Sequence, residues 1–171
     1  MITIRESVLQ DAEKIAACID QVAKERKYLT STQGFSKEQT REFLKMLSDA
    51  GGIQLVCRDG DIIAGWCDII PGSFEGMYHT GHLGMGLLKQ YRFRGLGKKM
   101  LSQIMRMAFS GKFERIELEV FASNVSAINL YKNFGFKQEG VKRKARKLNN
   151  KYDDILVFGL LKKEWEEKAN R

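Results

Sequence analysis

Apolar residues recur along the chain with two different periods, and each period predicts an element. At the start, Ile2 and Ile4 alternate with polar residues, as in a short strand. Apolar residues of the segment 8–22 then follow the three-to-four spacing of an amphipathic helix. Ser36-Lys37-Glu38-Gln39 has the pattern of a capping box, which predicts the start of a second helix.

The middle of the chain predicts a hairpin, a strand and a long helix. Ile53–Cys57 and Ile62–Ile70 are rich in apolar residues and flank Asp59-Gly60, a pair typical of tight hairpin turns. The apolar segment Thr80–Leu88 follows and is interrupted by two glycines. Apolar residues then recur at helical spacing over the segment 96–108, which predicts an amphipathic helix.

The last third alternates strands with a helix. Arg115–Phe121 alternates apolar and charged residues, and Asn124 is a natural N-cap for a helix that ends at Gly135. Two more strands, about Phe136–Leu148 and Tyr152–Leu161, precede a charged tail. This order predicts an α/β protein of the α+β mixed type, with a central mixed, mostly antiparallel sheet and helices on both faces. Without a linker or repeat, we expect residues 1–171 to form a single domain.

Composition narrows the class of protein. Of the 171 residues, 43% are hydrophobic and 29% charged, as in ordinary globular proteins. We expect no membrane association, because no apolar run reaches the roughly 20 residues that a spanning helix needs. The first residues lack a signal-peptide pattern, and the odd number of cysteines, 3, suggests reduced thiols, so we expect a cytoplasmic protein. The net charge of +8 favours an anionic partner or serves solubility.

One turn carries the residues expected of an anion site. Arg92-Phe93-Arg94-Gly95-Leu96-Gly97-Lys98 lies between an apolar strand and an amphipathic helix. Glycines let backbone N–H groups approach a pyrophosphate, and a helix start adds about half a positive charge. Gly84 and Gly86 lie just before this turn. They suggest a β-bulge that leaves further N–H groups unpaired; alternatively, these small residues only relieve crowding between helix and sheet. A helix start with solvated basic residues is the alternative interpretation of the turn.

Residues Gly81 to Phe136 resemble the GNAT superfamily of acetyl-CoA-dependent N-acetyltransferases. Arg92-x-x-Gly95-x-Gly97 is similar to the family's cofactor motif, Gln/Arg-x-x-Gly-x-Gly/Ala. Leu-Glu-Val-Phe-Ala-Ser-Asn at 118–124 and Ala-Ile-x-Leu-Tyr-x-x-x-Gly-Phe at 127–136 are similar to a later family motif. The resemblance is particularly to bacterial enzymes that acetylate the N-terminus of a ribosomal protein, and to bacterial amino-acid N-acetyltransferases. It implies the GNAT fold and acetyl-CoA as cosubstrate.

The resemblance also implies roles for individual residues. Backbone groups of Met85, Gly86 and Leu87 are implied to pair with the pantetheine arm, and the turn 92–98 to hold the pyrophosphate. Asn124 is implied to reach the pantetheine or to orient the loop that follows. Two further residues are implied to be catalytic, with Tyr131 near the sulfur as general acid and Glu119 as general base.

The residues themselves leave the catalytic assignments open. Tyr131 continues an apolar helix face and is equally a core residue by pattern, while Glu119 lies on a strand face where carboxylates are usually solvated. A base acting through water is the alternative, and His82 or Glu75 are further candidates for proton removal. His79 and His82 do not form a metal pair, because no cluster of further ligands accompanies them, so we expect no metal.

The expected function is transfer of the acetyl group of acetyl-CoA to a primary amine by direct attack in a ternary complex. The acceptor is left open between a small amine, an amino acid and a protein N-terminus; ribosome association and a homodimer are open as well. The basic run between Lys142 and Lys151 departs from the ribosomal-protein enzymes, which tend to carry aromatic residues there. It is either a solvated strand edge or an anion-binding surface. The alternative function is a non-catalytic module that binds acetyl-CoA, or RNA through this hairpin.

Overall fold

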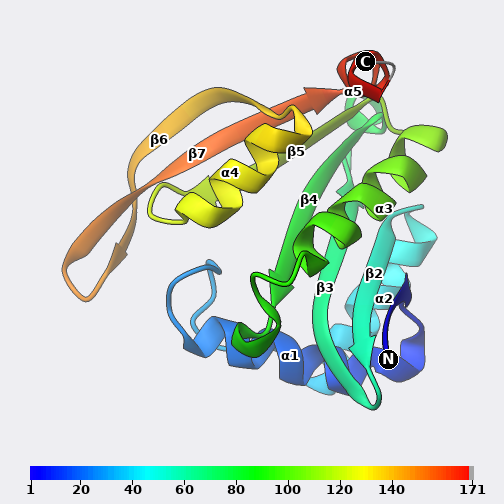
Figure 1. The fold of residues 1–171 in the computed structure, drawn as a ribbon, viewed down its shortest axis with the longest axis vertical. Coiled ribbons are helices and arrows are strands. Elements are labelled where there is room, and N and C mark those ends of the chain that lie inside the picture. Colours follow the sequence, from blue (N-terminus) through cyan, green and yellow to red (C-terminus); the bar gives the residue numbers. More distant parts are fainter. Residues whose placement is uncertain (170–171) are drawn as a thin grey trace.

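The computed structural model describes residues 1–169 and contains a seven-stranded sheet with the order β1-β2-β3-β4-β5-β7-β6 (Figure 1). Neighbouring strands are antiparallel except for β4 and β5, which are parallel. The predicted sheet, mixed and mostly antiparallel, is therefore confirmed. The strands are β1 (Ile2–Glu6), β2 (Ile53–Asp59), β3 (Ile62–Pro71), β4 (Thr80–Leu87), β5 (Arg115–Phe121), β6 (Lys137–Leu148) and β7 (Lys151–Leu161).

Helices cover both faces of the sheet. The crossovers from β4 to β5 and from β5 to β6 each contain one helix, and the right-handed rule places these two helices on the same face. The two helices that connect β1 with β2 cover the opposite face. The helices are α1 (Ala12–Lys24), α2 (Lys37–Asp49), α3 (Leu96–Ser110), α4 (Val125–Phe134) and α5 (Lys162–Ala169), with short 3-10 helices η1 (Leu9–Asp11), η2 (Glu75–Met77) and η3 (Lys89–Tyr91).

Local sequence signals mark several element ends. Ser36 caps α2 as predicted, because its hydroxyl accepts from the Gln39 N–H (3.1 Å) and the Gln39 side chain accepts from the Ser36 N–H (2.9 Å). Gly60 has a φ of +55° in the β2–β3 turn, which explains the Asp-Gly pair. The first helix begins at Ala12 rather than near Val8, because η1 precedes it.

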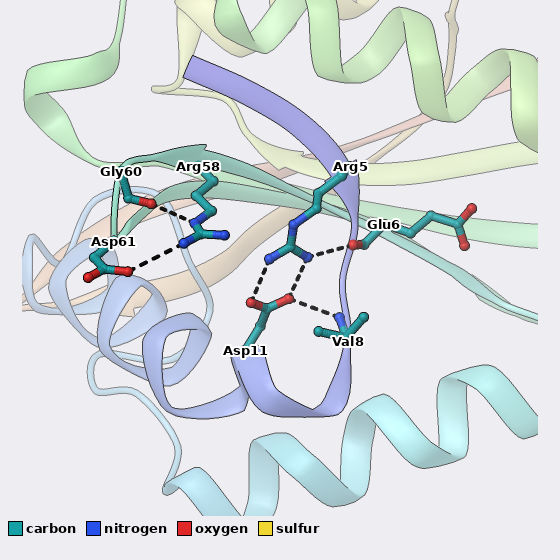
Figure 2. Close-up of polar contacts among 7 residues, drawn as sticks. All are labelled: Arg5, Glu6, Val8, Asp11, Arg58, Gly60 and Asp61. Atoms are coloured by element: carbon teal, nitrogen blue, oxygen red, sulfur yellow. Dashed lines mark hydrogen bonds and ion pairs between the residues drawn. The ribbon is translucent and has the colours of Figure 1, made fainter. Parts of the chain in front are cut away.

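A bidentate ion pair joins β1 to the start of α1 (Figure 2). The guanidinium of Arg5 donates to both carboxylate oxygens of Asp11, at 2.7 and 2.8 Å. One of these oxygens also accepts from the Val8 N–H at 2.9 Å. The Arg5 guanidinium lowers the pKa of Asp11, and the Val8 hydrogen bond acts in the same direction. This pair fixes the path of the chain between the first strand and the first helix.

The sheet opens between its two parallel strands. β4 and β5 are paired from Thr80↔Arg115 to His82↔Glu117 and then diverge, as Figure 1 shows on the side away from α5. The predicted bulge at Gly84 and Gly86 does not occur in the β3–β4 ladder, which keeps one register from Gly65↔Leu87 to Pro71↔Gly81. The edge of β4 beyond His82 is instead exposed by the divergence of β5.

Candidate active site

A cavity of about 430 Å³ occupies the opening between β4 and β5. Its lining includes most of the residues implied by the two family motifs, although they come from four separate elements. Two residues of the predicted phosphate turn do not line it, because Leu96 is buried in the core and the Arg94 guanidinium lies 5.5 Å from the centre of the Tyr91 ring. The predicted residues that line the cavity are Met85, Gly86, Leu87, Arg92, Phe93, Gly95, Gly97, Lys98, Glu119, Asn124 and Tyr131.

The cavity extends to both faces of the sheet, so it has a side next to α3 and a side next to α1. Met85 and Leu87 point toward α3, since their side chains lie 3.6 Å from where a Cβ on Gly97 would be. Side chains alternate along a strand, so Gly84 and Gly86 face the opposite side, the side of α1. A Cβ on Gly86 would meet the Trp66 ring at 2.3 Å, so glycine is required there. The α3 side leads to the phosphate turn, and the α1 side leads to the loop after α1.

The turn before α3 presents a row of backbone donors. Phe93 and Gly95 both have left-handed backbones, with φ of +60° and +76°. Within residues 1–169, the N–H groups from Phe93 to Lys98 have no backbone partner. They include the first N–H groups of α3, where the helix dipole adds positive potential. This arrangement fits a pyrophosphate, which needs several N–H donors at close range.

Arg92 supports this turn by contacts that the sequence could not reveal. Its guanidinium forms an ion pair with both carboxylate oxygens of Glu25, at the C-terminal end of α1. Its Nε donates to the Leu87 carbonyl at 2.9 Å, and its guanidinium carbon lies 4.6 Å from the centre of the Tyr28 ring. The Arg92 charge is thus neutralised by Glu25 and holds the turn against α1 and β4. The exposed Lys98 side chain remains as a lining cation beside the turn.

Tyr131 combines burial with access to the cavity. It lies in α4 with 7% of its surface exposed, and its ring contacts Phe136 edge-on with centroids 5.8 Å apart. Burial raises the pKa of Tyr131. Its hydroxyl therefore stays protonated at neutral pH, as a general acid must. The core and site interpretations of this residue are compatible in the structure.

Glu119 lies on the α1 side of the cavity, with Phe121 two residues further along β5. Its carboxylate forms an ion pair with Lys142 of β6, one of the residues of the basic run. His82, on β4, also lines the cavity, whereas Glu75 and His79 do not. An amine entering from the α1 side would therefore meet the Glu119 carboxylate in competition with the Lys142 ammonium.

Asn124 caps the helix that carries Tyr131. Its Oδ1 accepts from the Ala127 N–H at 3.3 Å, and its residue also lines the cavity. Asn124 was implied either to reach the pantetheine or to orient the loop that follows, and this contact corresponds to the second role.

Asp68 is a buried carboxyl that sequence reasoning missed. It lies on β3 opposite Gly84, where an added Cβ would be 3.0 Å from its Oδ1. Its Oδ2 accepts from Gln54 Nε2 at 3.3 Å, and burial raises the pKa of Asp68 to about 7. The signal in the sequence that could have identified it is a carboxylate within the apolar run of β3. Gly84 is therefore needed for space beside Asp68.

Other candidate chemistry is sparse in the described residues. Cys18, Cys57 and Cys67 are free thiols and all are buried. Among residues 1–169, no three His, Cys, Asp or Glu side chains are grouped as metal ligands would be. No helix in that range is both long and apolar enough to span a bilayer.

The split sheet with helices on both faces has the architecture of the GNAT fold. The model of the acetyltransferase (GNAT) family matches residues 18–136, which is more than half of the chain. The chain therefore belongs to this family of acetyltransferases, whose members use acetyl-CoA, and acetyl-CoA is its cosubstrate. The unpaired N–H groups of the turn before α3 are consistent with this cosubstrate.

Known proteins resemble the chain over most of its length. It is 32% identical over 119 residues to the L-amino acid N-acetyltransferase AaaT of Escherichia coli K12, a match that covers 68% of this chain and 73% of that protein. A GNAT-family acetyltransferase structure from Streptococcus pneumoniae has a TM-score of 0.88 at 27% identity, covering 94% of this chain and 99% of the other. The yncA structure from Salmonella typhimurium, solved with its cofactor acetyl-CoA, has a TM-score of 0.87 at 17% identity, covering 94% and 93%.

Proposed function

We propose that this chain is an N-acetyltransferase that moves the acetyl group of acetyl-CoA to a primary amine by direct attack in a ternary complex. The observation that carries the proposal is that one cavity has two different sides. Backbone donors before α3 and the Tyr131 side chain border it from one side of the sheet, and Glu119 borders it from the other. Two substrates can therefore reach a common point without exchanging places.

The proposed roles follow from the chemistry of each step. Acetyl-CoA supplies a thioester, and the reaction forms a C–N bond as the C–S bond breaks. Glu119, directly or through water, accepts the proton that the amine loses. Tyr131 donates a proton to the departing sulfur and keeps its own proton until then because it is buried. The acceptor is a small-molecule amine or a protein N-terminus.

Binding of the cosubstrate can be tested separately from catalysis. Calorimetric titration with acetyl-CoA should give binding to the wild type and none to Gly95→Glu, which places bulk and negative charge at the proposed pyrophosphate site. Gly60→Glu is a matched control, since Gly60 also has a positive φ, +55°, and also has open space around its Cβ position. Equal affinity in Gly95→Glu and wild type would overturn the assignment of the turn.

Catalysis is tested by mass spectrometry with acetyl-CoA and a panel of primary amines. Transfer to at least one amine is expected, and Glu119→Gln should slow it by roughly 10²-fold or more at pH 7. With a peptide N-terminus as acceptor, the defect should shrink at pH 9, because an α-amine with a pKa near 7.7–8.0 is then already neutral. Binding of acetyl-CoA without transfer to any amine would support the non-catalytic alternative. A defect in Glu119→Gln that is equal at both pH values would remove Glu119 as the base.

A further inference from the structure

Two distant segments of the chain meet beside the α1 side of the cavity. Figure 1 shows the loop after α1 beside the β6–β7 hairpin, and two hydrogen bonds join these segments. Arg146 Nη2 donates to the Arg26 carbonyl at 2.7 Å. In return, Arg26 Nη2 donates to Asn149 Oδ1 at 3.3 Å. The two segments that carry these arginines, at positions 120 residues apart, are thereby held together.

The two arginines are next to residues that line the α1 side of the cavity. The Arg146 guanidinium carbon lies 4.4 Å from the centre of the Phe121 ring, and Phe121 lines the cavity two residues beyond Glu119. From the other segment, Tyr28 and Thr30 line the same cavity close after Arg26. Neither arginine lines the cavity itself, but the Arg146 guanidinium lies against its lining residue Phe121, and Arg26 precedes the lining residue Tyr28 by two positions.

Neither arginine is neutralised by a carboxylate within residues 1–169. Arg92 pairs with Glu25, whereas Arg26 and Arg146 make no ion pair within 4.0 Å. Asp153 is opposite Arg146 in the β6–β7 ladder, but its Oδ2 accepts a hydrogen bond from the Ser123 hydroxyl. Arg146 is nevertheless half-buried, which makes its charge more costly to leave unpaired than that of an exposed lysine.

We propose that Arg26 and Arg146 form an anion site for the acceptor, and that the acceptor carries a carboxylate close to its amine. This inference rests on the proposed acetyl transfer and narrows its substrate. A guanidinium presents two parallel N–H donors that match a carboxylate, so the pair recognises the charge and shape of that group. The ammonium end of the same molecule would then lie toward Glu119. A polyamine, which has only positive charges, meets repulsion at the same two arginines.

The test compares amino acids with their amides, because the amide removes the carboxylate and keeps the amine. Values of kcat/KM are measured with acetyl-CoA for L-methionine and L-methioninamide, for other amino acids with their amides, and for spermidine. The wild type should prefer the acid over the amide by roughly 10- to 100-fold, as expected for a hydrogen-bonded charge. Arg146→Gln and Arg26→Gln should each reduce this ratio toward one, and should improve the relative rate with spermidine.

Two further variants separate recognition from structural support. Lys147→Gln removes the same charge from the same hairpin, but its ammonium lies 5.2 Å from the centre of the Tyr152 ring, and it should keep the wild-type ratio. Asn149→Ala releases the Arg26 guanidinium without changing charge, so it should lower the acid-to-amide ratio less than Arg26→Gln does. If Arg146→Gln instead slows acid and amide equally, Arg146 is merely structural, and this result would overturn the anion site.

The inference and the proposed function fail in different ways. If amides and spermidine are acetylated by the wild type as well as amino acids are, the anion site is wrong and acetyl transfer stands. If acetyl-CoA binds and no amine of the panel is acetylated, the proposed function itself is wrong.

Discussion

At the scale of single residues, Tyr131 is the clearest case of a side chain with two roles. Tyr131 is buried as part of the core, and it also lines the cavity. Tyr131→Phe keeps the ring and removes the hydroxyl, so we expect kcat to fall by about tenfold or more while the affinity for acetyl-CoA hardly changes. Steady-state kinetics and calorimetric titration measure the two effects. Tyr152→Phe, at an exposed hairpin position, should leave both unchanged.

Wild-type turnover in Tyr131→Phe would remove this hydroxyl from the mechanism. The pH dependence gives a second check, since burial raises the pKa of Tyr131 above its ordinary value near 10. The group thus remains a proton donor throughout the neutral range. A loss of kcat between pH 7 and 9 that disappears in Tyr131→Phe would contradict the raised pKa.

Asp68 is a second single residue with a measurable effect, because its ionisation makes the free energy of unfolding depend on pH. Its pKa is raised from 3.8 to about 7, so the folded state favours the neutral carboxyl. Its contribution to stability is therefore fully present below about pH 4 and is lost as the pH rises toward 7. Asp68→Asn should raise the free energy of unfolding at pH 8, on the order of 2–4 kcal/mol, and change it little at pH 4.

Urea denaturation of Asp68→Asn and wild type at several pH values measures this difference directly. Asparagine can still accept from Gln54, so the substitution removes the charge with little change in packing. Glu42→Gln, on the exposed surface of α2, is the control and should follow the wild type at every pH. A difference between Asp68→Asn and wild type that does not vary with pH would show that Asp68 is not the titrating group.

At the scale of elements, the ion pair between Arg5 and Asp11 connects β1 with η1 and α1 (Figure 2). Asp11→Asn loses the bidentate contact to a charged partner, and we expect the free energy of unfolding at pH 7 to fall by about 1–3 kcal/mol. Arg5 lowers the pKa of Asp11, so the stabilisation is present above the ordinary Asp pKa of 3.8 and is lost as the pH falls through the lowered value. Denaturation at pH 7 and below pH 3 checks both.

Figure 2 also contains the control for this prediction. Asp61 forms ion pairs with Arg58 at 3.3 Å and with Lys14 at 3.1 Å, but 86% of its side chain is exposed. Solvent screens such pairs, so Asp61→Asn should change stability much less than Asp11→Asn does. If both variants lose the same free energy of unfolding, the bidentate geometry of Arg5 and Asp11 adds no stability beyond that of an exposed ion pair.

Most elements were predictable because their signals are local. The capping box at Ser36, the Asp-Gly turn before Ile62 and the alternation of Arg115–Phe121 all act within a few residues. Strand order was only partly accessible, since nothing local places β7 between β5 and β6. The bulge predicted at Gly84 and Gly86 is wrong, because a glycine in a strand indicates a local constraint without indicating its cause; here the cause is the space taken by Asp68 and the Trp66 ring.

The site was predictable where a motif is continuous and not where it depends on partners far along the chain. The glycines of the turn 92–98 could be read from sequence, but the pairing of Arg92 with Glu25, 67 residues away, could not. The same holds for Lys142, which pairs with Glu119, and for Arg146, which contacts Arg26. Side-chain pairs between distant segments depend on the fold and have no local signal.

At the scale of the whole molecule, the net charge of +8 should act on the cosubstrate. Coenzyme A carries a pyrophosphate and a further phosphate, so a cationic protein attracts it before contact. Salt screens this attraction within about 10 Å at 0.1 M ionic strength. We therefore expect KM for acetyl-CoA to rise severalfold between 20 mM and 300 mM salt, with kcat nearly constant.

Acetyl-pantetheine separates the global field from effects on the amine side. It has the same thioester but lacks the phosphates, so its KM should be higher than that of acetyl-CoA at low salt and should hardly vary with salt. Gly95→Glu should remove the advantage of acetyl-CoA over acetyl-pantetheine altogether, because bulk and negative charge at the turn exclude the phosphates. If both donors show the same dependence on salt, the positive charge acts on the acceptor or on the protein itself. The basic surface would then have no part in capturing the donor, and the N–H groups before α3 would have to account for its affinity alone.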